Sequence, residues 1–229
     1  MRRLCILILF FCSVAQAGVV VGGTRFVISE KKKSVSVSVY NRSAIAYLVN
    51  SKVTRGDIWS GNENAQTSDV AFTITPPLFS LAAGRENTLR IVQTSDNLPA
   101  DRESLYTVSI AAIPSGAAEP DKVQLAVRSN LKLIYRPSGL KGSPEEAYRQ
   151  LVWRHTAGGL TVENKTPYYV TLFNLKVNGK AIDDAGVVAP FSQRQSNWCT
   201  DKVNCQLVWQ SINDYGRVMP VVTKNINIE

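Results

Sequence analysis

The 229-residue chain contains a single histidine, His155, and four cysteines, two of which stand within its first twelve residues. A Ser–His–Asp or Cys–His catalytic arrangement would have to use His155, and no serine stands in a G-x-S-x-G segment. The spacing of a zinc site is missing. The glycine-rich segment Val21–Thr24 is not followed by the helix that a phosphate-binding loop requires. The sequence therefore predicts no enzyme, no metal site and no cofactor.

The hydrophobic run Leu4–Val14 has eleven residues, which is too short to anchor the chain in a bilayer. It follows the cationic start Met1–Arg3 and precedes Ala15-Gln16-Ala17, a small-residue cleavage site. This order is typical of a secretory signal peptide. We expect residues 1–17 to direct export of the protein and to be removed by cleavage after Ala17. The alternative is a buried N-terminal strand.

The chain has no clustered basic surface that would favour nucleic acid. Its formal net charge is +8, which becomes +6 once cleavage removes Arg2 and Arg3. The basic residues are spread along the sequence apart from Lys31–Lys33, which lies between two strand-like segments and is expected to form a solvated turn. Basic and aromatic residues do not interleave, and no nucleic-acid-binding motif is present. We expect no nucleic-acid partner.

The mature chain keeps only two cysteines, Cys199 and Cys205. In an exported protein a disulfide is the default state for such a pair. The five residues between them suit a tight turn or a hairpin, and the spacing excludes a redox C-x-x-C motif. A zinc site would need two more ligands, and His155 is expected to be remote. The sequence predicts a disulfide here.

Apolar and polar residues alternate along most of the chain, most regularly at Ser34–Val39, where serines alternate with valines. A period of two predicts strands, and clusters such as Asn62–Asn64 predict the turns between them. The expected strands of the first half are Val19–Ile28, Ser34–Tyr40, Tyr47–Val53, Ala71–Thr75, Thr88–Gln93, Leu105–Ile113 and Val123–Tyr135. Seven strands in about 120 residues are typical of an immunoglobulin-like sandwich.

A change of composition at Arg136–Pro144 predicts a linker, and Pro144–Leu151 is expected to make a helical turn. The expected strands beyond it are Leu160–Val162, Tyr168–Val177, Lys180–Ile182, Ser192–Asn197, Gln206–Ile212 and Val218–Ile228. We therefore expect an all-β protein with two immunoglobulin-like β-sandwich domains, residues 18–137 and 138–229, behind the signal peptide 1–17. No strong internal repeat is evident.

The segment Val123–Pro137 is the most distinctive part of the sequence. Its strand of about 13 residues is much longer than the usual 5–6. One face carries a regular apolar row, and the strand ends in Lys132 and Tyr135-Arg136-Pro137. A long apolar strand with an open edge can add itself to a sheet of another protein. An ordinary strand of the sandwich core is the alternative.

Six blocks of sequence carry a resemblance to a known family: Thr75–Pro77, Glu86–Ile91, Leu98–Leu105, Lys132–Pro137, Thr166–Tyr169 and Ile212–Gly216. In this order they resemble the periplasmic pilus chaperones of the chaperone–usher pathway, the PapD-like family. The resemblance covers essentially the whole mature chain and implies two sandwiches in an L-shaped arrangement, with a cleft between them. The short segment between Pro114 and Val123 is similar to that of the short-loop members.

The resemblance implies the partners of the chain. Members of this family lend a long strand to pilus subunits that lack their last strand, and pass them to an outer-membrane usher in the periplasm without a nucleotide. The implied donor residues here are Val123, Leu125, Val127, Ser129 and Leu131. Whether the unliganded protein caps its own strand as a dimer is left open.

The resemblance also implies roles for polar residues. Arg25 and Lys132 match the two cations that bind the C-terminal carboxylate of the subunit. Glu103, Arg136 and Asp214 match an ion network that holds the two domains at their angle. The Thr75-Pro76-Pro77 turn resembles one in which a proline bond is cis. The triplets at Asn41 and Asn164 resemble glycosylation sites, which carry no weight in a bacterial periplasm.

Two other classes of function are weighed against this one. A structural pilus or adhesin subunit would be a single incomplete sandwich, which the length of the chain and its linker disfavour. A generic exported ligand-binding sandwich would not require Arg25 and Lys132 to converge. A wide separation of these two side chains would favour it.

Overall fold

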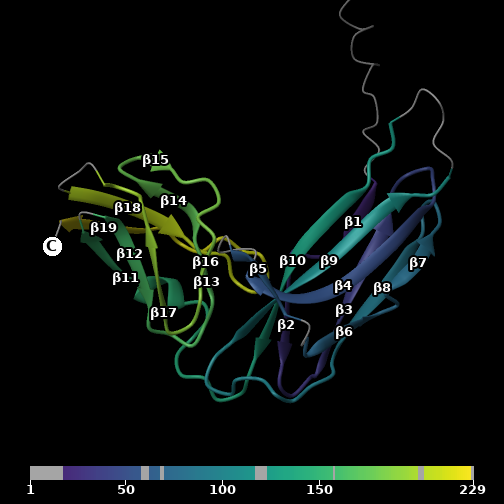
Figure 1. The fold of residues 1–229 in the computed structure, drawn as a ribbon, viewed down its shortest axis with the longest axis horizontal. Coiled ribbons are helices and arrows are strands. Elements are labelled where there is room, and N and C mark those ends of the chain that lie inside the picture. Colours follow the sequence, from purple (N-terminus) through teal and green to yellow (C-terminus); the bar gives the residue numbers. More distant parts are fainter. Residues whose placement is uncertain are drawn as a thin grey trace, which may run out of the picture.

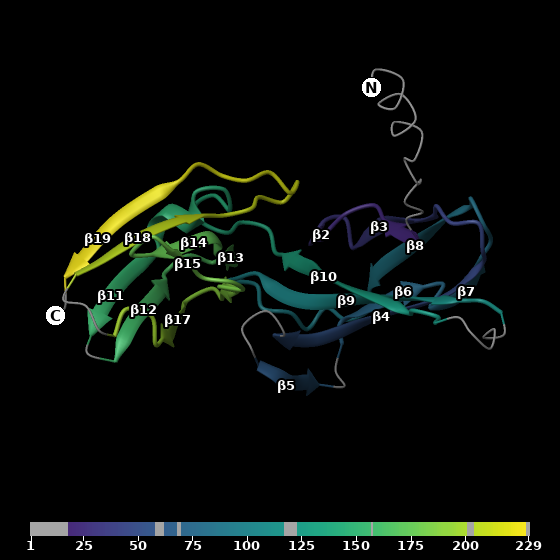
Figure 2. The same cartoon turned by 90° about the horizontal axis from the view of Figure 1, so that it is seen from above.

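The computed structural model describes residues 18–57, 62–67, 70–116, 123–156, 158–200 and 204–227. The expected signal peptide, residues 1–17, and most of the short loop between Pro114 and Val123 lie outside the described residues. Within the described part no helix is long and apolar enough to cross a membrane. The strands gather into two lobes that meet near the middle of the molecule at an open angle, with the C-terminal end of the chain at the far side of the second lobe (Figures 1 and 2).

The first domain is a sandwich of two sheets. Its strands are β1 (Val19–Val21), β2 (Arg25–Ser29), β3 (Ser34–Asn41), β4 (Tyr47–Asp57), β5 (Asn62–Thr67), β6 (Phe72–Thr75), β7 (Leu78–Leu81), β8 (Glu86–Gln93), β9 (Ser104–Pro114) and β10 (Val127–Arg136). One sheet has the order β1-β3-β8-β6. The other has the order β2-β10-β9-β4-β5, with β7 also paired to β4. Side chains such as Val37, Leu89 and Val108 fill the core between them.

The second domain is smaller and its sheets are shorter. It begins with the 3-10 turn η2 (Ala147–Gln150) and contains β11 (Val152–Thr156), β12 (Gly159–Asn164), β13 (Val170–Thr171), β14 (Phe173–Val177), β15 (Lys180–Ala181), β16 (Val187–Val188), β17 (Ser192–Ser196), β18 (Asn204–Gln210) and β19 (Val222–Asn227). The sheet orders are β11-β12-β17, β13-β16 and β15-β14-β18-β19. Trp153 and Trp209, with ring centroids 5.7 Å apart, lie in its core.

The all-β class and the two sandwiches agree with the sequence, but the expected strand Val19–Ile28 is wrong. The chain breaks at Gly22 and Gly23, and Gly23 has a φ of 158°. β1 pairs with β3 in one sheet, whereas β2 runs parallel to β10 in the other. Glycine permits the bend with which a strand leaves one sheet and enters its neighbour. This switch sets Arg25 directly opposite Lys132.

The expected strand Val123–Tyr135 begins too early. β10 starts at Val127, which lies opposite Ala112 of β9. In the same register Leu125 would face Pro114, the last residue of β9, and proline has no N–H to donate to a ladder. The four residues before Val127 therefore extend beyond the sheet. The expectation of a turn at Asn62–Asn64 is also wrong, because these residues belong to the strand β5.

Four further strands were not indicated by the sequence patterns, namely β5 and β7 in the first domain and β11 and β16 in the second. The expected strand Tyr168–Val177 is split into β13 and β14. The expected helical turn at Pro144–Leu151 corresponds to η2. The Thr75–Pro76 peptide bond is cis.

Candidate functional site

The first half of β10 is an open edge of the six-stranded sheet. β9 pairs with β10 over its whole length from Val127 to Tyr135, but β2 pairs with it only from Lys132 to Arg136. On the β2 side, the residues from Val127 to Leu131 thus have no ladder partner among the described strands. Such an edge presents backbone N–H and C=O groups that can pair with another chain.

An exposed apolar row lies next to this edge. The side chain of Val123 is 87% exposed, that of Leu125 73% and that of Val127 61%. Further along the same face, Leu131 and Leu133 are 8% and 0% exposed. The apolar row therefore begins in solvent and ends in the domain core. An ordinary core strand would have buried all of it.

Leu131 differs from the sequence-based expectation that it belongs to the donor residues. It packs in the first hydrophobic core with Phe26 and Leu133, so its side chain is already occupied within its own domain. Ser129 is half-buried and marks the change from exposed to buried positions. The residues that remain accessible to a partner are Val123, Leu125 and Val127.

Arg25 and Lys132 come together where the two domains meet. The parallel register of β2 and β10 places them opposite each other. The hydroxyl oxygen of Thr171, in the second domain, accepts a hydrogen bond of 2.6 Å from Arg25 Nη2 and one of 3.4 Å from Lys132 Nζ. The separation that would favour a generic ligand-binding sandwich is thus not observed.

The guanidinium of Arg25 is further oriented by backbone of the second domain. Its Nη1 donates to the carbonyl of Ile212 at 2.6 Å and to that of Asn213 at 3.5 Å. Burial lowers the pKa of Arg25, and this effect is opposed by the charges of Asp214 and Glu103. Sequence reasoning did not single out Thr171 or these carbonyls, because a lone threonine and backbone groups leave no pattern in a sequence.

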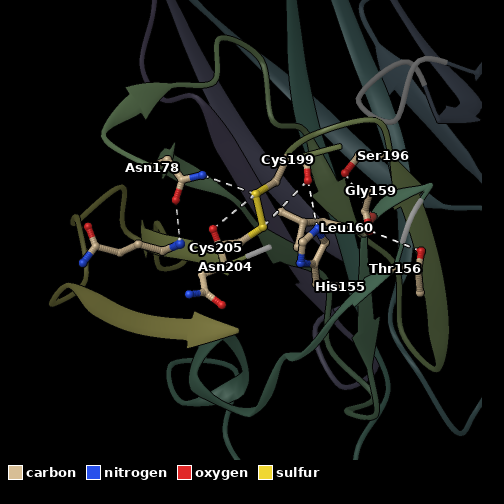
Figure 3. The surroundings of a disulfide bond; sticks show 10 residues. His155, Thr156, Gly159, Leu160, Asn178, Ser196, Cys199, Asn204 and Cys205 are labelled. Atoms are coloured by element: carbon tan, nitrogen blue, oxygen red, sulfur yellow. Dashed lines mark hydrogen bonds between the residues drawn. A yellow bond between two sulfur atoms is a disulfide. The ribbon is translucent and has the colours of Figure 1, made fainter. Parts of the chain in front are cut away.

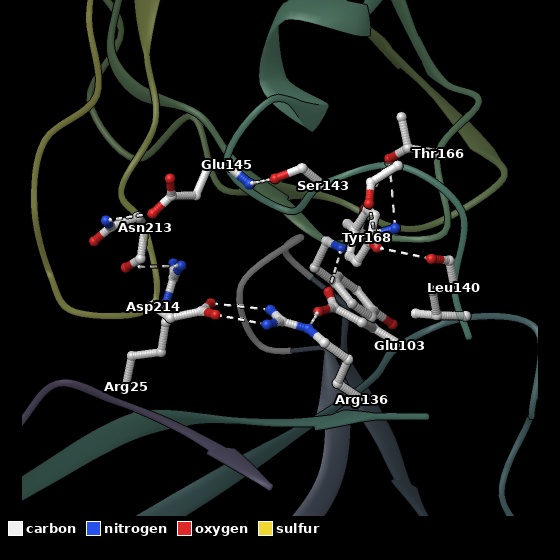
Figure 4. Close-up of polar contacts among 12 residues, drawn as sticks. Arg25, Glu103, Arg136, Leu140, Ser143, Glu145, Thr166, Tyr168, Asn213 and Asp214 are labelled. Atoms are coloured by element: carbon white, nitrogen blue, oxygen red, sulfur yellow. Dashed lines mark hydrogen bonds and ion pairs between the residues drawn. The ribbon is translucent and has the colours of Figure 1, made fainter. Parts of the chain in front are cut away.

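Glu103, Arg136 and Asp214 form a continuous ion network across the domain boundary (Figure 4). Arg136 Nε donates to Glu103 at 2.6 Å, and its two terminal nitrogens donate to the two oxygens of Asp214 at 2.6 and 3.0 Å. The paired bonds to Asp214 use the planar fork that only arginine provides. Arg136 thus joins the end of β10 to a loop of the second domain.

Glu103 is the most deeply buried member of the network, with 2% of its surface exposed. Its second oxygen accepts from the N–H of Tyr169 at 2.7 Å, and its own N–H donates to the carbonyl of Pro167 at 2.9 Å. Burial raises the pKa of Glu103, against the lowering effect of Arg136. Burial by itself lowers the pKa of Arg136, but its hydrogen bonds and ion pairs with Asp214 and Glu103 outweigh this effect and raise the pKa.

A small apolar cluster completes the contact between the domains. Leu105 and Ile134 of the first domain pack against Val187 of the second, with Val27 and Tyr169 at its border. These side chains point away from the core of the first sandwich, so the contact is additional to the folding of either domain. The cluster and the ion network both lie where the two domains meet.

Cys199 and Cys205 form a disulfide in the second domain, as the sequence predicts (Figure 3). The expectation that His155 lies far from them is wrong. Its ring nitrogen Nε2 is 2.9 Å from the carbonyl oxygen of Cys199, and its side chain is fully buried. This contact joins two residues 44 positions apart, one on β11 and one in the turn that follows β17.

Comparison with known proteins decides the family. Residues 18–141 match the family of pili and flagellar-assembly chaperones through the PapD N-terminal domain, and residues 146–222 match the pili assembly chaperone PapD C-terminal domain. The chain belongs to the PapD family of pilus-assembly chaperones. The two matches correspond to the two sandwiches, and the boundary between them falls in the segment after β10.

Relatives and solved structures agree with this assignment. The chaperone is 45% identical over 222 residues to the uncharacterized fimbrial chaperone YcbF of Escherichia coli strain K12, covering 96% of this chain and 94% of the relative. It is 37% identical to chaperone protein FocC of Escherichia coli, covering 92% and 91%. A chain of the Salmonella enterica complex of SafA pilin with the SafB chaperone matches with 32% identity and a TM-score of 0.78, covering 93% of this chain and 98% of that one.

The periplasmic chaperone SfaE also has this fold. It matches with 34% identity and a TM-score of 0.74, and the match covers 90% of this chain and 98% of SfaE. The likeness thus extends over both domains and the junction between them. It includes the region in which β10, Arg25 and the ion network lie.

Proposed function

We propose that this chaperone binds incomplete immunoglobulin-like pilus subunits by lending them the open edge of β10 and the segment before it. The observation that carries the proposal is the exposed row of Val123, Leu125 and Val127 beside an unpaired strand edge. Backbone hydrogen bonds along this edge supply affinity and register, and alternate side chains enter the groove of the subunit.

The apolar row supplies a large part of the driving force. Complete burial of one such side chain is worth about 1.5–3 kcal/mol, so three of them contribute about 5–9 kcal/mol before the costs of association. This gain offsets the ordering of the subunit. In the absence of a subunit the row stays in water, and burial by a second copy of the chaperone is a further candidate for how the unliganded protein protects it.

We propose that Arg25 and Lys132 bind the C-terminal carboxylate of the subunit. A slip of two residues keeps the same face of a donated strand inward, so the apolar row alone does not select one register. A carboxylate held at the domain junction selects it. Thr171 and the carbonyls of Ile212 and Asn213 support this role because they hold the guanidinium in place before any subunit arrives.

We propose that the network of Glu103, Arg136 and Asp214 keeps the angle between the domains fixed, and with it the position of the anchor residues relative to the donor strand. Arg136 ends the same strand that carries Lys132, and Asp214 directly follows the carbonyls that hold Arg25. A change of the angle between the domains would therefore displace both anchor residues. The network acts on geometry more than on net stability, because desolvation opposes the attraction of buried charges.

The setting of this activity follows from the family and the N-terminus. We propose that residues 1–17 direct export to the periplasm and are removed after Ala17. There the chaperone holds subunits and delivers them to an outer-membrane usher, where a strand of the next subunit replaces β10. This exchange needs no nucleotide and no metal.

The test is a substitution that changes the face of the donor segment. Leu125→Asp places a charge in the row and is expected to abolish complexes with co-expressed subunits, while the chaperone remains folded. The matched control is Ala126→Asp, the neighbouring exposed residue on the opposite face, which should still bind. Complexes are measured by co-purification from periplasm and by protection of the subunit from protease. Protection by Leu125→Asp equal to that by the control would contradict strand donation.

A further inference from the structure

Three potential metal ligands lie together in the second domain. The two sulfur atoms of Cys199 and Cys205 and a ring nitrogen of His155 all lie within 4.8 Å of one another. Figure 3 shows the imidazole of His155 beside the disulfide. Thiolate and imidazole are the ligands that Zn²⁺ prefers. In the oxidised protein the two sulfurs are bonded to each other and cannot act as thiolates.

The hydrogen bonds of His155 leave one of its nitrogens available. A carbonyl oxygen can only accept, so the contact of 2.9 Å with Cys199 places a proton on Nε2. In the neutral ring Nδ1 then carries the lone pair. Nδ1 is buried and has no hydrogen-bond partner among the described residues, although buried polar atoms usually have one. Histidines that bind metals commonly donate their other N–H to a carbonyl in this way.

We propose that the reduced form of this chain binds one Zn²⁺ ion through the thiolates of Cys199 and Cys205 and the imidazole of His155, and that the ion competes with formation of the disulfide. Reduction of the S–S bond gives two thiols: a dithiol supplies two electrons and two protons and becomes a disulfide, whereas a phosphine supplies two electrons and becomes a phosphine oxide, with the oxygen and the two protons coming from water. Binding of Zn²⁺ then releases one proton from each thiol. Oxidation by a disulfide-forming partner removes two electrons and expels the ion.

The geometry allows this exchange without rebuilding the domain. Zn–S bonds of about 2.3 Å and Zn–N bonds of about 2.0 Å require ligand atoms about 3.3–3.8 Å apart in a tetrahedron. The sulfurs are free to move to this separation once their bond is broken, since Cys205 lies on β18 and Cys199 lies in the turn that follows β17. Cys199 is only half-buried, so water can occupy the fourth position.

The competition matters because an exported chain reaches its compartment with reduced cysteines. Zinc bound at this stage would link Cys199 to Cys205, as the disulfide does, and would also join His155 of β11 to them. It would also withhold both thiolates, which are the reactive species in disulfide formation. The second domain can therefore be cross-linked either by the zinc ion or by the disulfide, but not by both. The availability of metal and oxidant determines which one forms.

The experiment uses the mature chain reduced with a phosphine under anaerobic conditions and titrated with Co²⁺. The expected result is one ion per chain, with the sulfur-to-cobalt charge-transfer band and the visible bands of tetrahedral cobalt, both lost on addition of Zn²⁺. The untreated, oxidised chain should show neither band. Zinc should slow reoxidation of the reduced chain by about tenfold or more, and a chelator should restore the rate.

His155→Gln tests the third ligand and is expected to weaken cobalt binding by at least about tenfold. Because this substitution alters a buried position, a synthetic peptide spanning Trp198–Gln206 provides a second comparison with both cysteines and no histidine. Absence of the charge-transfer band, or an affinity of the whole reduced chain no greater than that of the peptide, would overturn the proposal. The same holds if zinc leaves the reoxidation rate unchanged.

Discussion

Each domain buries an asparagine completely, Asn41 in the first and Asn164 in the second. In both, the side-chain oxygen accepts from the N–H and the hydroxyl of the residue two positions later, Ser43 or Thr166. In both, the side-chain nitrogen lies within hydrogen-bond distance of three carbonyls, those of Ile45, Leu81 and Ala82 in one domain and of Tyr168, Val188 and Ala189 in the other. The two domains therefore share a local asparagine motif that the sequence patterns did not reveal.

The same comparison explains the two N-x-S/T triplets. Each triplet places an asparagine and a hydroxyl so that they close the turn after a strand, β3 in the first domain and β12 in the second. This is the local side chain to backbone bonding for which Asn, Ser and Thr are favoured in turns. The asparagine is inaccessible to any glycan.

The domains differ in what they leave exposed. The first has the longer strands and carries the row Val123, Leu125 and Val127 in solvent at the end of β10. The second has short strands, a disulfide and a fully buried histidine beside it. We infer from the difference that the first domain supplies the surface that works on a subunit, while the second supplies a stapled support for the anchor.

Loss of the proposed anchor is the largest expected effect. Arg25→Ala or Lys132→Ala removes a charge-assisted partner of the subunit carboxylate, at a cost of about 3–5 kcal/mol in binding. Affinity for a subunit should fall by about two to three decades or more. Lys132→Arg should rescue poorly, because the planar fork needs different space from an ammonium group. Near-normal capture of subunits by Lys132→Ala, measured by pull-down, would contradict the anchor and would show that the apolar row alone supplies the binding.

Arg136→Ala should destabilise the junction between the domains by about 3–5 kcal/mol, because it leaves the carboxylate of Glu103 buried without its cation. Glu103→Gln is the milder partner. It removes a carboxylate whose pKa is raised by burial, and it leaves Arg136 bound to Asp214. We therefore expect the free energy of unfolding to fall by only about 1 kcal/mol. Urea unfolding of both variants gives the two free energies. Equal losses of free energy in the two variants would show that the ion pair itself supplies the stability. They would contradict the view that Arg136→Ala is costly because it leaves a buried carboxylate without its cation.

The paired asparagines should contribute nearly equal stability to their own domains. Asn41→Ala and Asn164→Ala each remove the donors to three carbonyls, and we expect a loss of about 3 kcal/mol in either case. Asparagine to aspartate at the same positions keeps the acceptor and removes the donors, so it should be at least as damaging. Domain-resolved hydrogen exchange measures the effects. A large loss in only one domain would contradict a shared structural role.

Removal of the disulfide is the smallest of these effects and should be confined to the second domain. A double substitution Cys199→Ser with Cys205→Ser should lower its free energy of unfolding by about 2 kcal/mol, because the closed loop is short. Trp153 and Trp209 lie in that domain and report its unfolding by fluorescence. Protection of the β3–β8 pair in the first domain should be unchanged. A loss there as well would show that the domains do not unfold independently.

Alternation along the chain predicted most strands and both sandwiches, since local periodicity follows from which face of a strand is buried. It did not predict the break at Gly22-Gly23, because apolar residues stand on both sides of the change of sheet, at Val19–Val21 and at Phe26–Ile28. It also placed the start of β10 too early, because exposed and core positions share one apolar row. The register of β10 depends on the end of β9 at Pro114, which is set by pairing between distant segments.

The structure shows where the expected site residues lie, whereas their roles toward a subunit stay predictions. Arg25, Lys132, Glu103, Arg136 and Asp214 stand in blocks that resemble the family, and the structure brings them to one junction. Periodicity did not indicate that Leu131 is buried in its own domain, because it does not show where the core ends. The proximity of His155 to Cys199 and the role of Thr171 arise from tertiary contacts, for which sequence separation gives no guide.

Amide hydrogen exchange on the chaperone alone and bound to a subunit tests the donated strand most directly. We expect Val123–Leu131, which has an open edge in the unliganded protein, to become strongly protected in the complex. The sheets of the second domain should keep the exchange rates they have without the subunit. Unchanged exchange over Val123–Leu131, with new protection appearing in the second domain instead, would contradict the central claim.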